Sequence, residues 1–298
     1  MRRVEYKVRS ADGRLLSVLT MGPPRGYPVL FFHGTPGIRG IYDREIEEGA
    51  RRGLRHVFYS RPGYAGSDRA PGRSIADCAA DVEAIVDELG IDRFYVVGES
   101  GGGAHALACA ALLPGRVEAV AVQSGIAPPD AEGLAWEAGM GEGNRQEFGA
   151  MRRGAGALRA YLEVAAEELR SIETLEQLRA ALEGHLCAAD RAAIEGGFGE
   201  YLLAAWRQVG EDEIWGWLDD DLAHGGDWGF DLEQVTAPAA FWHGREDLMV
   251  PWSHAAWLAD RLPNAELHLL DGEGHISIAS RYGAALDALV EGNACSDT

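Results

Sequence analysis

Long apolar segments are missing from this chain. No run approaches the ~18 consecutive apolar residues of a membrane-spanning helix, and the charged N-terminus has no apolar stretch behind it. The second absence argues against a secretory signal peptide. We therefore expect a protein of the cytoplasm that has no membrane partner.

Cysteine and positive charge are scarce as well. The four cysteines, Cys78, Cys109, Cys187 and Cys295, show no C-x-x-C spacing, which argues against a zinc cage, a disulfide framework or a redox motif. Lys7 is the only lysine, and the formal net charge is −20. Because phosphate binding needs clustered Lys and Arg, nucleic acid is not expected as a partner. We expect a small-molecule substrate, no cofactor and no metal; the oligomeric state stays open.

Apolar residues are plentiful overall, since 47% of the 298 residues are hydrophobic, enough for a substantial core. Short β-rich runs alternate with helical patterns, as they do in repeated βα units. Eight strands are predicted, near residues 4–9, 15–20, 29–33, 56–60, 94–97, 117–123, 239–242 and 265–270. The pattern favours an α/β fold with a mostly parallel eight-stranded sheet flanked by helices.

The pattern changes in residues 125–225. Strand signals are absent there, and apolar stripes at helical spacing follow one another, for example at Leu158 and Leu162. We therefore predict an α/β core made of residues 1–124 and 226–298. The segment between them is predicted to be a helical lid, inserted after the sixth strand.

A serine stands on a predicted strand-to-helix turn. The sequence G-E-S-G-G at 98–102 follows the apolar run 94–97 and precedes a helix of small residues. A nucleophilic serine in this position needs a strained backbone, so that its hydroxyl stands clear of the sheet. Side chains at Gly98 or Gly102 would collide with the backbone of the turn. The pattern predicts Ser100 as a nucleophile.

A serine hydroxyl needs a base, and the base must be held in one tautomer by a third group. His275 follows the eighth predicted strand and Asp247 the seventh, both at the edge where a parallel sheet gathers its site. We assign His275 as base and Asp247 as acid. Glu246 is the alternative acid, expected to point the other way. The sixth strand leads into residues 123–125, which offer no carboxylate.

The other histidines near these loops have ordinary explanations. His243 lies at a strand end and His268 within a strand, so both are interpreted as structural. His254 is placed on the following helix and expected to be exposed. The competing interpretation of His275 is an ordinary loop histidine.

Backbone N–H groups aimed at the developing oxyanion would lower the barrier to acyl transfer. One donor is expected from Gly101, immediately after the nucleophile. The second is expected from the loop H-G-T-P-G at 33–37. Because Pro36 has no N–H, Thr35 is the predicted donor.

Substrate contacts are expected from this loop and from tryptophans in the lid. The candidates are His33, Gly34, Trp136, Trp206, Trp215 and Trp217. The tryptophans either line an apolar pocket or pack lid helices onto the core. Acidic runs at 211–213 and 219–221 could bind a substrate amine, but a solvated helix face is the favoured interpretation.

Together, the H-G-x-P-G loop and the G-x-S-x-G turn resemble those of the α/β-hydrolase superfamily. The segments 61–67 and 227–230 also resemble superfamily loops. The resemblance is to a subgroup with a helical lid, related to proline iminopeptidases, esterases and lactonases. It implies the α/β-hydrolase fold and the order Ser, Asp, His for the triad.

The activity implied is that of a cofactor-independent serine hydrolase, which cleaves a small or medium ester, lactone or related acyl substrate through an acyl-enzyme. Gly101 departs from the Trp usual in proline iminopeptidases, which counts against peptidase activity. Dehalogenases and epoxide hydrolases of this fold use Asp where this chain has Ser100. An aminopeptidase or amidase on the same triad, and a slow-turnover ligand receptor that retains it, are the alternatives.

Overall fold

The eight predicted strands form one sheet in the computed structural model, which describes residues 2–38, 40–195, 197–211 and 213–294. Their bounds are β1 (Arg2–Arg9), β2 (Leu15–Gly22), β3 (Tyr27–Phe32), β4 (Leu54–Tyr59), β5 (Phe94–Glu99), β6 (Val117–Gln123), β7 (Ala239–Gly244) and β8 (Ala265–Leu270). The order is β1-β2-β4-β3-β5-β6-β7-β8. Only the β1–β2 and β2–β4 pairings are antiparallel. The predicted mostly parallel sheet is therefore confirmed.

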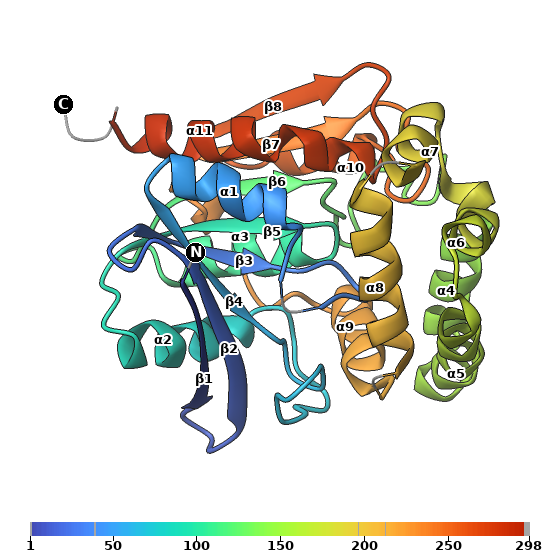
Figure 1. Ribbon diagram of the computed structural model, residues 1–298, viewed down its shortest axis with the longest axis horizontal. Helices are drawn as coiled ribbons and strands as arrows, with labels where there is room; N and C mark the ends of the chain where they lie inside the picture. The colour runs from blue at the N-terminus through green and yellow to red at the C-terminus, as the bar shows by residue number, and fades with distance from the viewer. Residues whose placement is uncertain (1, 39, 196, 212, 295–298) are drawn as a thin grey trace.

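Helices cover both faces of the sheet (Figure 1). One face carries α1 (Asp43–Arg51) and α11 (Tyr282–Ala294), which contact each other. The other carries α2 (Cys78–Glu88), α3 (Gly102–Leu112) and α10 (Ser253–Ala259). Each face has its own apolar core, so the central strands are buried on both sides.

Strand β5 illustrates why the sequence pattern is a continuous apolar run. Phe94 and Val96 point into the core shared with α2 and α3. Tyr95 and Val97 point into the core on the α1 side. Successive side chains of a strand alternate between its faces, so a strand covered on both sides needs apolar residues at every position.

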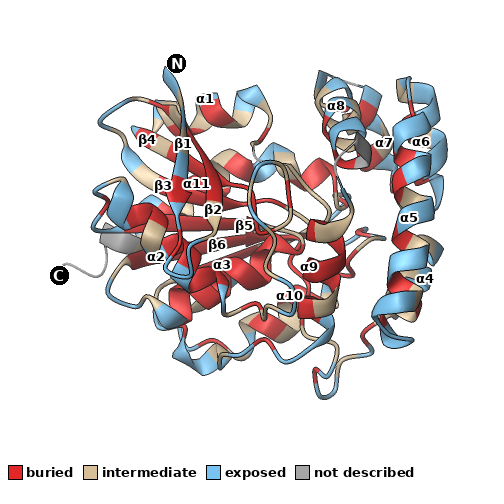
Figure 2. Cartoon of the chain, turned by 90° about the horizontal axis from the view of Figure 1, so that it is seen from below, coloured by how far each residue is buried: buried red, intermediate tan, exposed pale blue. Residues whose placement is uncertain are grey.

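Residues between β6 and β7 form a series of helices, as predicted, and no strand occurs in the described part of 125–225. The helices are α4 (Glu142–Arg152), α5 (Ala155–Ser171), α6 (Leu175–Leu182), α7 (Ala188–Glu195), α8 (Gly197–Glu211) and α9 (Trp215–Gly225). We call them the inserted helices. They share a third apolar core, and α9 lies nearer the sheet than α4 to α6 (Figures 1 and 2). Their role as a lid stays a prediction.

Two expectations about burial are wrong. Asp219, Asp220 and Asp221 are not on a solvated face but are at most 3% exposed. Arginines of the core pair with Asp219 and Asp220, because this part of α9 packs against the loop after β4. Asp221 instead shares a hydrogen bond with Glu147 of α4. His254 is fully buried rather than exposed, with its ring between the Ala127 N–H and the Trp136 carbonyl.

Two sequence features lie outside the described residues. Cys295 belongs to the terminal segment, and Asp212 is the centre of the first acidic run. Cys78 and Cys109 are buried in the core, as small apolar residues would be. No described helix is long and apolar enough to cross a membrane.

The backbone around the Ser100 turn leaves no room for side chains. A Cβ at Gly102 would overlap with the carbonyl oxygen of Phe32 at the end of β3. We predict that Gly102→Ala lowers the free energy of unfolding by about 1–3 kcal/mol through overpacking. The matched control is Gly156→Ala, in an exposed turn of α5 with open space around it, which should raise stability by about 0.5–1 kcal/mol. Urea unfolding measures both, and a Gly102→Ala variant as stable as the wild type would contradict this packing.

Candidate active site

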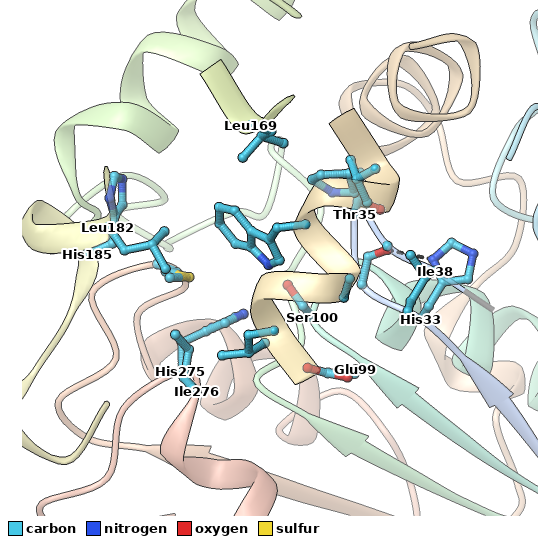
Figure 3. Close-up of a pocket in the computed structure, with 18 of the residues that line it drawn as sticks. His33, Thr35, Ile38, Glu99, Ser100, Leu169, Leu182, His185, His275 and Ile276 are labelled. Atoms are coloured by element: carbon cyan, nitrogen blue, oxygen red, sulfur yellow. Dashed lines mark hydrogen bonds between the residues drawn. The ribbon is translucent and has the colours of Figure 1, made fainter. Parts of the chain in front are cut away.

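A cavity of about 630 Å³ lies between the ends of the parallel strands and the inserted helices. Ser100 and His275 line it from the core, while Leu169 and Leu182 line it from α5 and α6 (Figure 3). The volume is in the range of small-molecule sites. The predicted nucleophile and the predicted base therefore line the same cavity.

Ser100 occupies a turn that few residues with side chains adopt. Its φ is +51°, in the left-handed region. Its N–H donates to the Gln123 carbonyl at 2.8 Å, which ties the turn to β6. A Cβ at Gly98 would overlap with the Gly102 carbonyl, so the expected collision with the turn itself applies at that position. At Gly102 the obstacle is the neighbouring strand β3.

His275 and Asp247 form a hydrogen-bonded pair. The His275 Nδ1 donates to the Asp247 Oδ2 at 2.8 Å. The other oxygen, Oδ1, accepts the N–H groups of Met249 and Val250 at 2.9 and 2.8 Å. His243 Nε2 lies 3.1 Å from Oδ2, so this histidine, which the sequence analysis interprets as structural, contacts the Asp247 carboxylate directly. Asp247 is thus bonded on both oxygens, and the bond to Nδ1 leaves Nε2 as the nitrogen with which the predicted base could accept a proton.

The two groups shift each other's pKa in opposite directions. Burial alone would raise the pKa of Asp247, but His275 and His243 hold it below its ordinary value. Burial alone would lower the pKa of His275, yet the Asp247 carboxylate raises it, with a further contribution from Glu99. The pair is therefore arranged to stabilise an imidazolium beside a carboxylate.

Asp190, which the sequence did not reveal as important, holds the loop that carries His275. This fully buried residue of α7 accepts the N–H groups of Ile276 and Ser277 at 2.9 and 2.8 Å. An inserted helix thus fixes the backbone next to the proposed base. No local signal around position 190 indicates this contact, because it joins residues far apart in sequence.

The loop at 33–37 lies directly against the Ser100 turn. A Cβ at Gly34 would lie 3.4 Å from the Ser100 Cβ, and one at Gly101 would lie 2.5 Å from the Thr35 Oγ1. The two predicted oxyanion donors are therefore neighbours beside the serine. His33 lines the same cavity, and burial lowers its pKa to about 3, so its ring is neutral.

The four candidate tryptophans fall into two pairs. Trp206 and Trp217 line the cavity, whereas Trp136 and Trp215 are not among its lining residues. Trp136 packs in a separate apolar cluster and donates its Nε1 hydrogen to the Ala127 carbonyl. The Trp215 ring faces arginine guanidinium groups on α5 and on the loop after β4. This second pair therefore lies outside the cavity that Ser100 and His275 line, in the packing role that was the alternative interpretation.

Carboxyl side chains in the cavity wall were not predicted. Glu99, adjacent to Ser100, and Glu45 of α1 line the strand side, and burial raises the pKa of both. Glu147 and Glu168 line the side of the inserted helices. The position of Glu99 at the carboxyl end of β5 is the signal that could have found it. Among the described residues no group of three or more potential ligands is arranged to hold a metal ion.

A family model described as the alpha/beta hydrolase fold matches residues 27–282. This chain therefore belongs to the alpha/beta hydrolase family. The sequence is 27% identical over 286 residues to a non-heme chloroperoxidase of Streptomyces lividans, covering 90% of this chain and 92% of that one. It is 28% identical to a 2-hydroxymuconate semialdehyde hydrolase of Pseudomonas putida, covering 88% and 86% of the two chains.

A solved structure supports the same fold. A thermophilic esterase from Thermogutta terrifontis superposes with a TM-score of 0.68 at 18% identity, covering 98% of each chain. At this identity the likeness concerns the fold alone. Family and relatives together support a hydrolase.

The charge around His275 predicts how activity depends on pH. A base must be neutral to accept a proton, and the pKa of His275 is raised, so activity should be lost as pH falls through that raised value. Because the Glu99 carboxylate favours the imidazolium, Glu99→Gln should shift the acid limb of the kcat/KM profile to lower pH. The matched control is the exposed Glu246, whose change to Gln should leave the limb in place. A shift to higher pH in Glu99→Gln would refute this account of the electrostatics.

Proposed function

We propose that this chain is a cofactor-independent serine hydrolase that cleaves a small or medium carboxylic ester, lactone or related acyl substrate through an acyl-enzyme. One observation carries the proposal. His275, bonded to the buried Asp247, lines the same cavity as Ser100, and Ser100 sits in a strained turn flanked by Gly98 and Gly101. Strain and pairing of this kind, gathered at one cavity, are typical of an activated nucleophile.

The reaction begins with attack of the Ser100 Oγ on the substrate carbonyl carbon. His275 Nε2 accepts the hydroxyl proton, and Asp247 stabilises the resulting imidazolium. The N–H groups of Thr35 and Gly101 donate to the oxyanion of the tetrahedral intermediate. When the intermediate collapses, His275 gives the proton to the leaving alkoxide. A water molecule then attacks the acyl-enzyme with the same histidine as base, which releases the acid and restores Ser100.

The substrate class rests on the cavity and on the relatives. A chamber of about 630 Å³ with apolar side chains from the inserted helices suits a substrate of modest size. The relatives include enzymes named as hydrolases, and one fold neighbour is named an esterase. Short p-nitrophenyl esters, assayed beside aminoacyl anilides, separate an esterase from an aminopeptidase. Turnover of neither would favour the alternative of a slow-turnover ligand receptor.

We predict that a fluorophosphonate probe labels the wild-type protein at Ser100, because only an activated serine reacts readily with this electrophile. Ser100→Ala should abolish the labelling. Peptide mass spectrometry of the labelled protein identifies the modified residue. Labelling that persists in the alanine variant would place the nucleophile elsewhere.

Asp247→Asn should leave the fold intact and lower kcat by about 10⁴, by analogy with the loss seen when a triad aspartate becomes asparagine. Exposed Glu246 is the matched control, since Glu246→Gln changes the neighbouring carboxylate without touching His275. Ester hydrolysis and thermal unfolding of both variants are the measurements. If Glu246→Gln caused the larger loss, the acid would be misassigned.

A further inference from the structure

Asp220 of α9 is a fully buried carboxylate beneath the loop that carries Thr35. Its Oδ2 accepts a hydrogen bond from the Tyr64 hydroxyl at 2.8 Å and one from the Thr35 hydroxyl at 3.0 Å. Arg61 lies 2.6 Å from the same oxygen, and Arg73 lies 2.8 Å from Oδ1. The carboxylate is thus bonded to the loop after β4 and to the loop after β3.

Arg61 extends these contacts along the loop after β3. This arginine is 1% exposed, and its guanidinium donates to the carbonyl oxygens of His33 and Gly34, the latter at 2.8 Å. It also donates to the Thr35 Oγ1 at 3.1 Å. Three consecutive loop residues are therefore held by one side chain, which is itself oriented by Asp220. The planar fork of arginine suits such a role because its donors are fixed relative to one another.

The Thr35 hydroxyl completes the arrangement. It donates to Asp220 and accepts from Arg61, so both bonds fix the side chain, which lies beside the proposed oxyanion site at Gly101. A threonine held in this way has little freedom to rotate its own backbone N–H away from the cavity. The position of that N–H decides how well it stabilises an oxyanion.

The Asp220 carboxyl group is ionised at neutral pH. Burial would raise its pKa, but Arg61 and Arg73 hold the pKa well below the ordinary value. A buried charge of this kind is costly unless it is paired, and loss of one partner leaves the other unpaired. The neighbouring Asp219 provides a contrast. It pairs with Arg69 at 2.7 Å and so anchors the same helix. Among the hydrogen bonds of the described residues, none joins Asp219 to the loop after β3.

We propose that Asp220 is a positioning residue for the oxyanion hole: through Arg61 and the Thr35 hydroxyl it fixes the Thr35 N–H against the Ser100 turn. The inference rests on the proposed function and deepens it. Its consequence is that the inserted helices supply part of the catalytic geometry in addition to shaping the pocket. A chimera with foreign inserted helices should therefore keep residues 215–225, and also Asp190 at the His275 loop, if it is to remain active.

The test compares Thr35→Val with Thr35→Ser. Valine removes the hydroxyl and keeps the backbone N–H, whereas serine keeps both. Because a displacement of about 1 Å can cost 10²-fold in rate, Thr35→Val should lower kcat about 10- to 100-fold on a short p-nitrophenyl ester. KM should change much less than kcat, and Thr35→Ser should recover most of the lost kcat. A trifluoromethyl ketone, which forms an anionic hemiketal on the serine, should bind Thr35→Val more weakly by a similar factor.

Asp220→Asn is measured in the same assays, with Asp219→Asn as the matched control on the same helix. Asp220→Asn should lower kcat at least as much as Thr35→Val, and Asp219→Asn should retain the wild-type kcat. Thermal unfolding checks that each variant is folded. If Asp220→Asn fails to fold, the valine and serine variants of Thr35 decide the matter on their own.

The outcomes separate this inference from the proposed function. An active wild-type protein whose folded Thr35→Val variant keeps full kcat and full ketone affinity overturns the role of Asp220 and leaves the serine hydrolase standing. A loss confined to KM, or an equal loss in Asp219→Asn, overturns it too, since either result indicates a general packing effect. A wild-type protein that neither reacts with fluorophosphonate nor hydrolyses any ester refutes the proposed function, and this inference with it.

Discussion

The close approach of three backbone segments at Ser100 is the constraint on which the site depends. The turn after β5, the end of β3 and the start of α3 come so near one another that side chains at Gly98 and Gly102 would overlap with carbonyl oxygens. This contact leaves Ser100 at a φ of +51°, with its hydroxyl at the cavity. Strain of this kind persists only where the surrounding structure over-determines it. Here the parallel sheet provides that support.

Core and inserted helices are interdependent around this turn. Two buried aspartates on the inserted helices reach loops of the core, Asp190 at the loop of His275 and Asp220 at the loop of Thr35. Each satisfies hydrogen-bond donors that would otherwise be left buried without partners. The proposed base and one proposed oxyanion donor thus depend on residues of α7 and α9. The inserted helices therefore hold loops of the core in position, and they also line the cavity.

The strand and turn positions could be predicted because their signals are local. An apolar run followed by a glycine-flanked serine places Ser100, and loops at strand ends bring Asp247 and His275 to one edge of a parallel sheet. The misjudged residues depend on partners distant in sequence. Asp219 and Asp220 look like part of a solvated run until α9 meets the arginines after β4. His254 is buried because its ring lies between the Ala127 N–H and the Trp136 carbonyl. The spacing of residues along the sequence cannot predict contacts between segments that lie far apart in the chain.

In the function proposed here, Ser100, His275 and the Thr35 loop form one acyl-transfer site. A crystal structure with a boronic acid, which mimics the tetrahedral intermediate when it bonds to an activated serine, tests this most directly. We predict a bond from boron to the Ser100 Oγ, with one boronate oxygen in hydrogen-bond range of the backbone nitrogens of Thr35 and Gly101. A boronate that bonds to another residue, or whose oxygens face away from both nitrogens, would contradict an acyl-transfer site built from these residues.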